Sequence, residues 1–104
     1  MVIYEVNLNV NEAIYSEYYQ WLLTHMDDML KIKGFKKVEI GLVENTEAEK
    51  NKKIRISYTI DSYENLKKYM TNHAPKMRAA GIEKFGDQFQ ADRRIILEPL
   101  VFEA

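Results

Sequence analysis

The chain lacks cysteine altogether, and its 104 residues include only four glycines, two prolines and two histidines. Without thiols it has no disulfide, no cysteine nucleophile and no thiolate metal ligand. The glycines are scattered rather than gathered in a phosphate-binding loop, and neither a nucleophile elbow nor a zinc-protease motif occurs. The sequence therefore predicts no metal site and no bound cofactor.

An excess of one charge sign is also missing. The chain has 15 Lys and Arg residues against 16 Asp and Glu residues, which gives a formal charge of −1. This balance supplies little of the electrostatic attraction that drives nucleic-acid binding. No apolar stretch reaches the length of a membrane span, and Glu5 interrupts the apolar start that a signal peptide needs. We expect a cytoplasmic protein with no nucleic-acid partner and no membrane partner.

What the sequence does contain is the composition of one folded domain. Hydrophobic residues make up 46% of the chain and charged residues 30%, a balance typical of folded proteins rather than disordered ones. A chain of this length buries a core but divides poorly into two domains. We therefore predict a single domain that spans residues 1–104.

The first third of the chain predicts a strand followed by a helix. Apolar residues alternate with mostly polar ones from Val2 to Val10, which is the pattern of a strand with one buried face. Asn11 is a favourable helix cap, and apolar residues then recur every three or four positions up to Leu30. This spacing predicts an amphipathic helix that ends before Gly34.

The middle of the chain predicts a β-hairpin. Residues 35–44 alternate between apolar and polar side chains, and residues 54–60 do the same. The polar segment 45–53 separates these two strands. We expect this segment to be the mobile tip of the hairpin.

The last part of the chain predicts an interrupted helix and a final strand. Asp61 with Glu64 resembles a capping box at the start of a second helix. Pro75 must interrupt or restart this helix because proline has no N–H to donate, so a kinked helix or two short helices should result. Gly86 is a plausible helix end, and residues 89–97 supply an apolar-rich strand.

The predicted order of elements is βαββαβ, whose crossover geometry places both helical segments on one face of a four-stranded antiparallel sheet. We therefore predict an α+β, ferredoxin-like fold. The side that faces the helices is expected to carry Val2, Tyr4, Val6, Leu8, Val38, Ile40, Leu42, Ile54, Ile56, Tyr58 and Ile60. The opposite side is expected to carry Ile3, Glu5, Asn7, Glu39, Val43, Arg55, Ser57 and Thr59. This second face is mixed, so it either closes on a second copy in a homodimer or lies against solvent.

Several short motifs resemble those of a small bacterial family of unknown function. They are Tyr4-Glu5-Val6-Asn7-Leu8, Trp21-Leu22 with His25 and Met29-Leu30, His73-Ala74-Pro75 with Arg78, Phe85-Gly86 with Phe89, and Arg93-Arg94-Ile95. That family is similar in outline to dimeric α/β barrels, a group that includes cofactor-free quinone-forming monooxygenases, stress-responsive barrel proteins, and several lyases and isomerases. The resemblance implies a dimeric α/β barrel.

The wider group often has a Tyr-x-x-x-His-x-Pro arrangement that borders the cavity between helices and sheet. Tyr69, His73 and Pro75 match it in this chain. Parts of that group carry a second histidine shortly after the proline, and this chain has Met77 and Arg78 there. The resemblance therefore implies a cavity beside Tyr69 and His73, and it transfers no particular catalytic histidine.

The two histidines are the candidate catalytic residues, because imidazole has the side-chain pKa that best suits proton transfer near neutrality. His25 shares one flank of its predicted helix with Trp21 and Asp28. Beside an aromatic wall it can bind or deprotonate a phenolic or enolic substrate, or it can bond to Asp28 or water at the edge of the core. His73 either contributes to a pocket or bonds to carbonyls that the Pro75 break leaves free.

The candidate ligand-binding residues are Trp21, Tyr58, Tyr69, Arg93 and Arg94. Arg93 and Arg94 are adjacent in a predicted strand, so they point to opposite sides of the sheet and only one can serve a given site. A guanidinium suits a carboxylate or phosphate on a ligand, and it suits a carboxylate of the chain or of a partner subunit equally well. The tyrosines either place hydroxyls in a cavity or fill the core.

Two functions remain open. The sequence favours a structural or regulatory homodimer, whose aromatic residues fill the core and whose histidines and arginines satisfy joints and the interface. The alternative is a cofactor-independent enzyme or binder of a small aromatic or polyketide-like molecule in a pocket between sheet and helices. In that case His25 or His73 is the proton acceptor and an arginine is its electrostatic partner.

Overall fold

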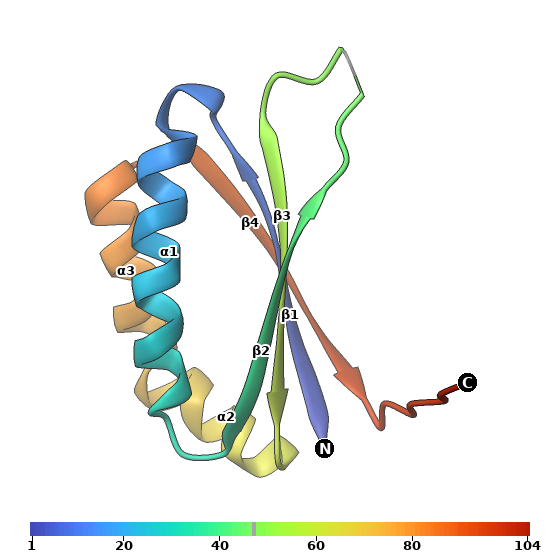
Figure 1. The fold of residues 1–104 in the computed structure, drawn as a ribbon. Coiled ribbons are helices and arrows are strands. Elements are labelled where there is room, and N and C mark those ends of the chain that lie inside the picture. The colour runs from blue at the N-terminus through green and yellow to red at the C-terminus, as the bar shows by residue number, and fades with distance from the viewer. Residues whose placement is uncertain (47) are drawn as a thin grey trace.

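The computed structural model describes residues 1–46 and 48–104 and has the predicted fold (Figure 1). Its strands are β1 (Val2–Val10), β2 (Phe35–Val43), β3 (Lys52–Ile60) and β4 (Phe89–Leu97), and its helices are α1 (Tyr15–Leu30), α2 (Tyr63–Asn72) and α3 (Ala74–Phe85). The strands form one antiparallel sheet in the order β2-β3-β1-β4. The helices lie on one side of this sheet and leave the other side uncovered (Figure 1). The prediction of an α+β, ferredoxin-like fold is confirmed.

Helix α1 begins later than its cap residue suggests. The Asn11 side chain accepts a hydrogen bond from the Ala13 N–H at 2.9 Å, and this bond caps a short 3-10 helix, η1 (Glu12–Ile14), ahead of α1. The buried residues of α1 are Tyr18, Leu22, Met26 and Met29. Leu30, the last residue of the helix, is 41% exposed.

The turn between α1 and β2 depends on Gly34. Its φ of +94° lies in the left-handed region, and a Cβ at this position would lie 2.7 Å from the Cβ of Asn65. A larger residue would therefore be strained and would push α2 away from the turn. The predicted end of the first helix before Gly34 is confirmed.

The second helical region is interrupted at Pro75 as predicted, and it forms two helices. Helix α2 ends at Asn72, and α3 begins at Ala74 with Pro75 in its first turn. The predicted capping box is wrong by one position, because Ser62 rather than Asp61 precedes α2 and its Oγ accepts a hydrogen bond from the Asn65 N–H at 3.1 Å.

In the described part of the chain, no helix has both the length and the apolar character needed to cross a membrane.

The hairpin between β2 and β3 is also confirmed, with slightly different bounds. β2 ends at Val43, and β3 begins at Lys52 rather than at residue 54. The predicted mobile tip, residues 45–53, therefore overlaps the start of β3. It also includes residue 47, which lies outside the described residues, so its mobility stays a prediction.

The core lies between the sheet and the helices. The predicted helix-facing residues of β1 and β3 are all buried: Val2, Tyr4, Val6, Leu8, Ile54, Ile56, Tyr58 and Ile60. On β2, Val38 and Ile40 are half-buried, while Leu42 is 63% exposed. β2 is an edge strand that turns away from the helices at this end as the sheet twists (Figure 1). Leu42 therefore faces the helix side but lies beyond the core.

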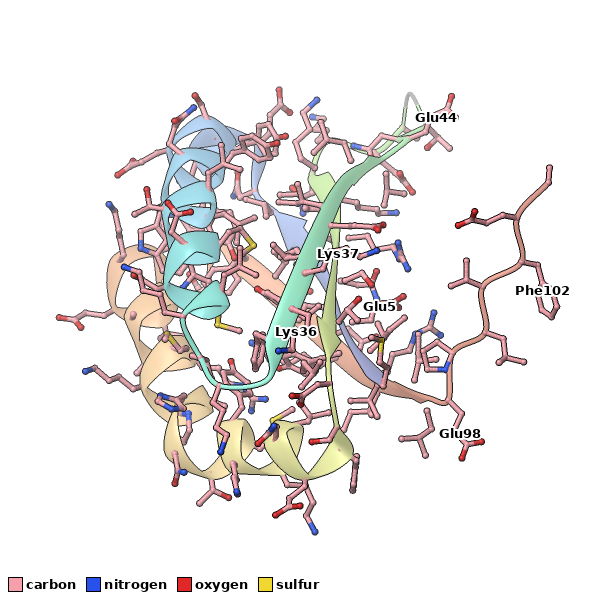
Figure 2. All side chains as sticks on the ribbon, turned by 60° about the horizontal axis from the view of Figure 1, so that its bottom comes forward. Glu5, Lys36, Lys37, Glu44, Glu98 and Phe102 are labelled. Carbon is pink, nitrogen blue, oxygen red and sulfur yellow. The ribbon has the colours of Figure 1, made fainter. Side chains whose placement is uncertain are left out.

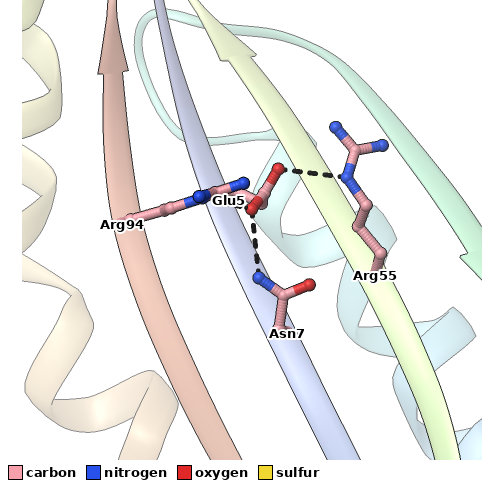
Figure 3. A network of polar contacts seen from close by, with 4 residues as sticks. All are labelled: Glu5, Asn7, Arg55 and Arg94. Carbon is pink, nitrogen blue, oxygen red and sulfur yellow. Dashed lines mark hydrogen bonds and ion pairs between the residues drawn. The ribbon is translucent and has the colours of Figure 1, made fainter.

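The uncovered face is organised around Glu5 (Figure 3). The Glu5 side chain is 3% exposed, because arginine side chains from both neighbouring strands close over it. Arg94 Nε donates a hydrogen bond to Glu5 Oε1 at 2.6 Å, and Arg55 Nε donates to Oε2 at 3.0 Å. Asn7 Nδ2 donates to Oε1 at 3.0 Å. The sequence left open whether an arginine of the Arg93–Arg94 pair binds a carboxylate of the chain, of a partner subunit or of a ligand, and in the structure Arg94 binds Glu5 of the same chain.

These contacts lower the pKa of Glu5 from its ordinary value of 4.5 to about 2. The hydrogen bond from Arg94 is the largest cause, followed by that from Asn7, and both favour the ionised carboxylate. Because the folded state depresses the pKa, the carboxylate stabilises the fold above pH 4.5. This contribution is lost as the pH falls from 4.5 towards 2.

We predict that Glu5→Gln lowers the free energy of unfolding at pH 7 by about 1–3 kcal/mol, because it leaves the guanidiniums of Arg55 and Arg94 without a carboxylate. The control is Glu39→Gln, which removes the ion pair between Glu39 and Lys37. Because the Lys37 and Glu39 side chains are 62% and 64% exposed, this substitution should change the free energy of unfolding by less than about 0.5 kcal/mol. Urea unfolding at pH 7 and pH 3 measures both. Equal losses in the two variants would contradict the special position of Glu5.

Candidate functional site

A small cavity lies between the sheet and the helices, with a volume of about 60 Å³. Residues of β1, β3 and β4 form one wall, and residues of all three α-helices form the other. Most of the lining is apolar or aromatic. The polar groups that reach it belong to tyrosines, to Trp21 and His25, and to Arg78 and Arg93. The cavity thus gathers most of the candidate site residues in one place.

Tyrosine rings form one wall of the cavity. Tyr4 and Tyr58 are direct partners across β1 and β3, and their rings stack with centroids 5.8 Å apart. Tyr69 of α2 lies 5.8 Å from Tyr4 in a tilted arrangement. Burial raises the pKa of Tyr69 to about 12 and raises that of Tyr58 as well. Both phenols therefore remain protonated at neutral pH and present O–H groups rather than phenolates.

Trp21 and His25 form the opposite wall. They lie one turn apart on α1, and their rings stack at 5.1 Å with an angle of 10° between the planes. Burial lowers the pKa of His25, and the nearby charge of Asp28 opposes this effect only in part. His25 is therefore a neutral imidazole near neutrality, with a nitrogen able to accept a proton. Because the folded state lowers its pKa, protonation of His25 destabilises the fold as the pH falls below 6.5.

His73 lies outside the cavity. It sits at the junction of α2 and α3, where its backbone N–H donates to the Tyr69 carbonyl at 2.9 Å and its carbonyl accepts from the Met77 N–H at 3.0 Å. Its exposed ring stacks on Tyr69 at 6.3 Å. Backbone groups, rather than the imidazole, thus bridge the break before Pro75.

A groove on the outside of the cavity brings the two histidines together. His25 and His73 both line this groove between α1 and α3, whose volume is about 580 Å³. Trp21, His25 and Met77 line the groove and the inner cavity alike. These three side chains therefore form the partition between the two spaces, and only His25 of the two histidines borders both.

The adjacent arginines of β4 point to opposite sides, as their alternation predicts. Arg93 pairs in register with Val6 and lines the cavity, whereas Arg94 pairs with Glu5 on the uncovered face. Arg93 is therefore the member of the pair that faces the pocket. Arg94 does not join Trp21, Tyr58 and Tyr69 there, because the sheet lies between them.

Arg78 and Gly81 are two of the cavity residues that were not among the sequence candidates. Arg78 of α3 lines the cavity, and its Nη2 donates a hydrogen bond to the Tyr4 hydroxyl at 3.2 Å. Gly81 lies one turn further along α3, where a Cβ would come within 3.3 Å of the Trp21 ring and 3.4 Å of the Phe89 ring. The only advance signal for Gly81 was a glycine inside a helical segment, which often marks a close approach. The sequence singled out Arg78 only as part of the motif His73-Ala74-Pro75 with Arg78.

The chemistry available in the cavity follows from these groups. His25 can accept a proton, the tyrosine hydroxyls can donate hydrogen bonds, and the guanidiniums can stabilise negative charge. Within residues 1–46 and 48–104, no three His, Cys, Asp or Glu side chains are grouped so that they could hold a metal ion. The side chains of the cavity thus offer acid–base and electrostatic chemistry.

Solved structures with this fold include proteins of several descriptions. A dimeric ferredoxin-like protein from an uncultured marine organism is 14% identical, with 100% of both chains covered and a TM-score of 0.73. A proposed antibiotic biosynthesis monooxygenase from Bacillus cereus is 16% identical over 99% of this chain and 97% of that chain, with a TM-score of 0.70. A variant of SnoaB, a cofactor-independent oxygenase from Streptomyces nogalater, is 8% identical over 99% and 98%, with a TM-score of 0.69. At these identities the likeness establishes the fold alone.

No curated protein matches the chain. The profile of a family described as "Domain of unknown function (DUF4286)" matches residues 1–99. The predicted relationship to a family of unknown function is confirmed, and the chain belongs to this DUF4286 family.

Proposed function

We propose that the protein is a cytoplasmic homodimer with a regulatory role, which it exerts by binding a small aromatic molecule in the cavity between sheet and helices. The observation that carries this proposal is the cavity itself. Aromatic and apolar walls surround a few convergent polar groups, which is the usual composition of a small-molecule site. A core that served packing alone would gain stability by filling this space.

The size of the cavity indicates how a ligand enters. A volume of about 60 Å³ is well below the ~150 Å³ of a cavity that accepts benzene. An aromatic ring therefore has to displace part of the wall. Met77 is the side chain best suited to move, because methionine has flexible torsions and it stands between the cavity and the groove of about 580 Å³. Binding would join the two spaces.

The uncovered face supports the homodimer. Helices cover only one side of the sheet (Figure 1), and the other side carries Ile3 and Ile96 as cross-strand partners beside the Glu5 cluster. A two-fold axis would pair this surface with itself, burying the apolar residues and matching opposite charges. A structural neighbour described as dimeric gives further support at the level of the fold.

The C-terminal segment supports the same arrangement. Leu100, Val101 and Phe102 are 80%, 81% and 89% exposed, and Figure 2 shows the segment from Glu98 to Phe102 standing away from the rest of the chain. Three consecutive large apolar side chains in water are unfavourable, since burying each one is worth about 1.5–3 kcal/mol. A second copy of the chain would provide the missing surface.

A second candidate function is cofactor-independent catalysis in the same cavity. The specific observation in its favour is His25, a neutral imidazole held against Trp21 and facing the cavity. In this proposal His25 removes a proton from a phenolic or enolic substrate, and Arg93 stabilises the anion that forms. His73 would act only on a molecule in the outer groove. The SnoaB fold likeness is compatible with this chemistry.

We predict that the protein sediments with twice the chain mass of 12.3 kDa and that Ile96→Lys converts it to a monomer. The substitution places a charge on the uncovered face, next to Ile3. Leu23→Lys is the control, because Leu23 is 39% exposed on the outer side of α1, and it should remain dimeric. A wild-type protein that sediments as one chain at micromolar concentration would refute the homodimer.

We predict that phenol, used as a minimal aromatic probe, binds saturably in the about millimolar range expected of so small a ligand. Gly81→Ala should weaken this binding at least about fivefold, because the added methyl group fills space between the Trp21 and Phe89 rings. The control is Gly41→Ala, since a Cβ at Gly41 meets nothing within 4 Å. Ligand-observed NMR measures the affinities. Equal binding by all three proteins, or no saturable binding by the wild type, would count against the cavity.

Trp21 is the only tryptophan, so its fluorescence reports protonation of the stacked His25. We predict quenching as the pH is lowered, with a midpoint below 6.5 because burial disfavours the imidazolium. His25→Gln should abolish this transition, and His73→Gln should retain it. A midpoint at or above 6.5, or a transition that survives in His25→Gln, would remove the support for His25 as the proton acceptor.

A further inference from the structure

On the helix side of the sheet, two guanidiniums have no carboxylate partner among the described residues. The ion pairs within residues 1–46 and 48–104 involve Arg55 and Arg94, which share Glu5, and three lysines. Arg78 and Arg93 take part in none of these pairs. The guanidiniums on the uncovered face are thus paired with Glu5, whereas those on the helix side, Arg93 of β4 and Arg78 of α3, are in no ion pair among the described residues.

Arg78 and Arg93 come together from different elements. Arg78 lies on α3 and Arg93 on β4, and both line the inner cavity. Both also line a second groove along α3 and β4, whose volume is about 450 Å³. Phe89 is the third residue common to the two spaces. The two guanidiniums therefore lie where the aromatic cavity meets this groove.

The position of Arg78 is fixed by its neighbours. Its Nη2 donates to the Tyr4 hydroxyl at 3.2 Å and contacts the Met70 sulfur at 3.6 Å. Neither partner carries charge, so these contacts orient the guanidinium without neutralising it. Its remaining N–H donors can reach a planar acceptor, and the fork of guanidinium donors matches a carboxylate at two points.

The charge of the groove selects the charge of the ligand. Asp87 is the one carboxylate among the residues that line this groove with Arg78 and Arg93. Two guanidiniums and one carboxylate leave a single positive charge, which one carboxylate on a ligand would balance. A dianionic group such as a phosphate monoester would instead bring excess negative charge towards Asp87.

We propose that the cavity binds an aromatic monocarboxylate, with its ring among the cavity tyrosines and Trp21 and its carboxylate between Arg78 and Arg93. This inference rests on the proposed small-molecule function and names its ligand class. Arg93 and Arg78 then set specificity for the anion, while the aromatic walls supply the contact area. Arg94, one residue from Arg93, has no part in this recognition because its charge lies across the sheet.

The test compares benzoate with benzamide, which has the same ring and shape but no charge. Calorimetry or ligand-observed NMR on the dimeric wild type should show at least about tenfold tighter binding of benzoate, the preference expected of one charge-assisted contact. Arg93→Gln should remove this preference by weakening benzoate binding much more than benzamide binding. The control Arg94→Gln removes the same charge from the other face and should keep the preference.

The outcomes separate the inference from the function on which it rests. Equal binding of benzoate and benzamide by the wild type would overturn the carboxylate assignment and leave an aromatic site in place. A preference that is lost equally in Arg93→Gln and Arg94→Gln would also overturn it, since the effect would then be one of overall charge. If benzoate, benzamide and phenol all fail to bind, the small-molecule function itself is wrong.

Discussion

The alternation of side chains along β1 and β4 governs most of what this molecule can do. Helices cover only one side of the sheet. Successive side chains along a strand therefore point alternately into the closed core and to the open face. Tyr4 and Glu5 are neighbours in sequence, as are Arg93 and Arg94, yet each pair is divided by the sheet. The cavity and the candidate dimer surface are two consequences of this one constraint.

Charged side chains are paired differently on the two faces of the sheet. On the open face, Glu5 is buried by the arginines that bind it. Removing the carboxylate would leave the guanidiniums unpaired, and removing the guanidiniums would leave the buried carboxylate unpaired, and both changes are unfavourable. On the helix side, Arg78 and Arg93 are held near aromatic rings with no such compensation among the described residues. Both residues are exposed, and Asp87 supplies one negative charge to the groove that they line, so an anion from solvent can reach their guanidiniums. This contrast is the physical basis for assigning binding to one face and association to the other.

The elements of the fold were predictable because each leaves a strong local pattern. Alternation from Val2 to Val10, the three-and-four spacing of α1 and the break at Pro75 each follow from backbone geometry that acts over a few residues. Errors arose where two neighbouring residues compete for one role. Asp61 and Ser62 are both good caps, and Ser62 occupies the position from which its Oγ reaches the Asn65 N–H.

The site was predictable only in part, because it depends on packing between distant segments. Trp21 and His25 share a helix flank, and their spacing was enough to group them. The side of the sheet on which Arg93 lies required the register of β4 against β1. The contribution of Arg78 required the distance between α3 and Tyr4. A cavity volume is a small difference between the space enclosed by six elements and the side chains that fill it, so no local pattern contains it.

The central claim is that two chains associate and that each encloses a small molecule. Native mass spectrometry of the purified protein tests both parts in one spectrum, because it preserves subunit association and retained ligands. The account predicts twice the chain mass of 12.3 kDa, together with a discrete additional mass. A spectrum that contains only the mass of one unmodified chain would contradict it.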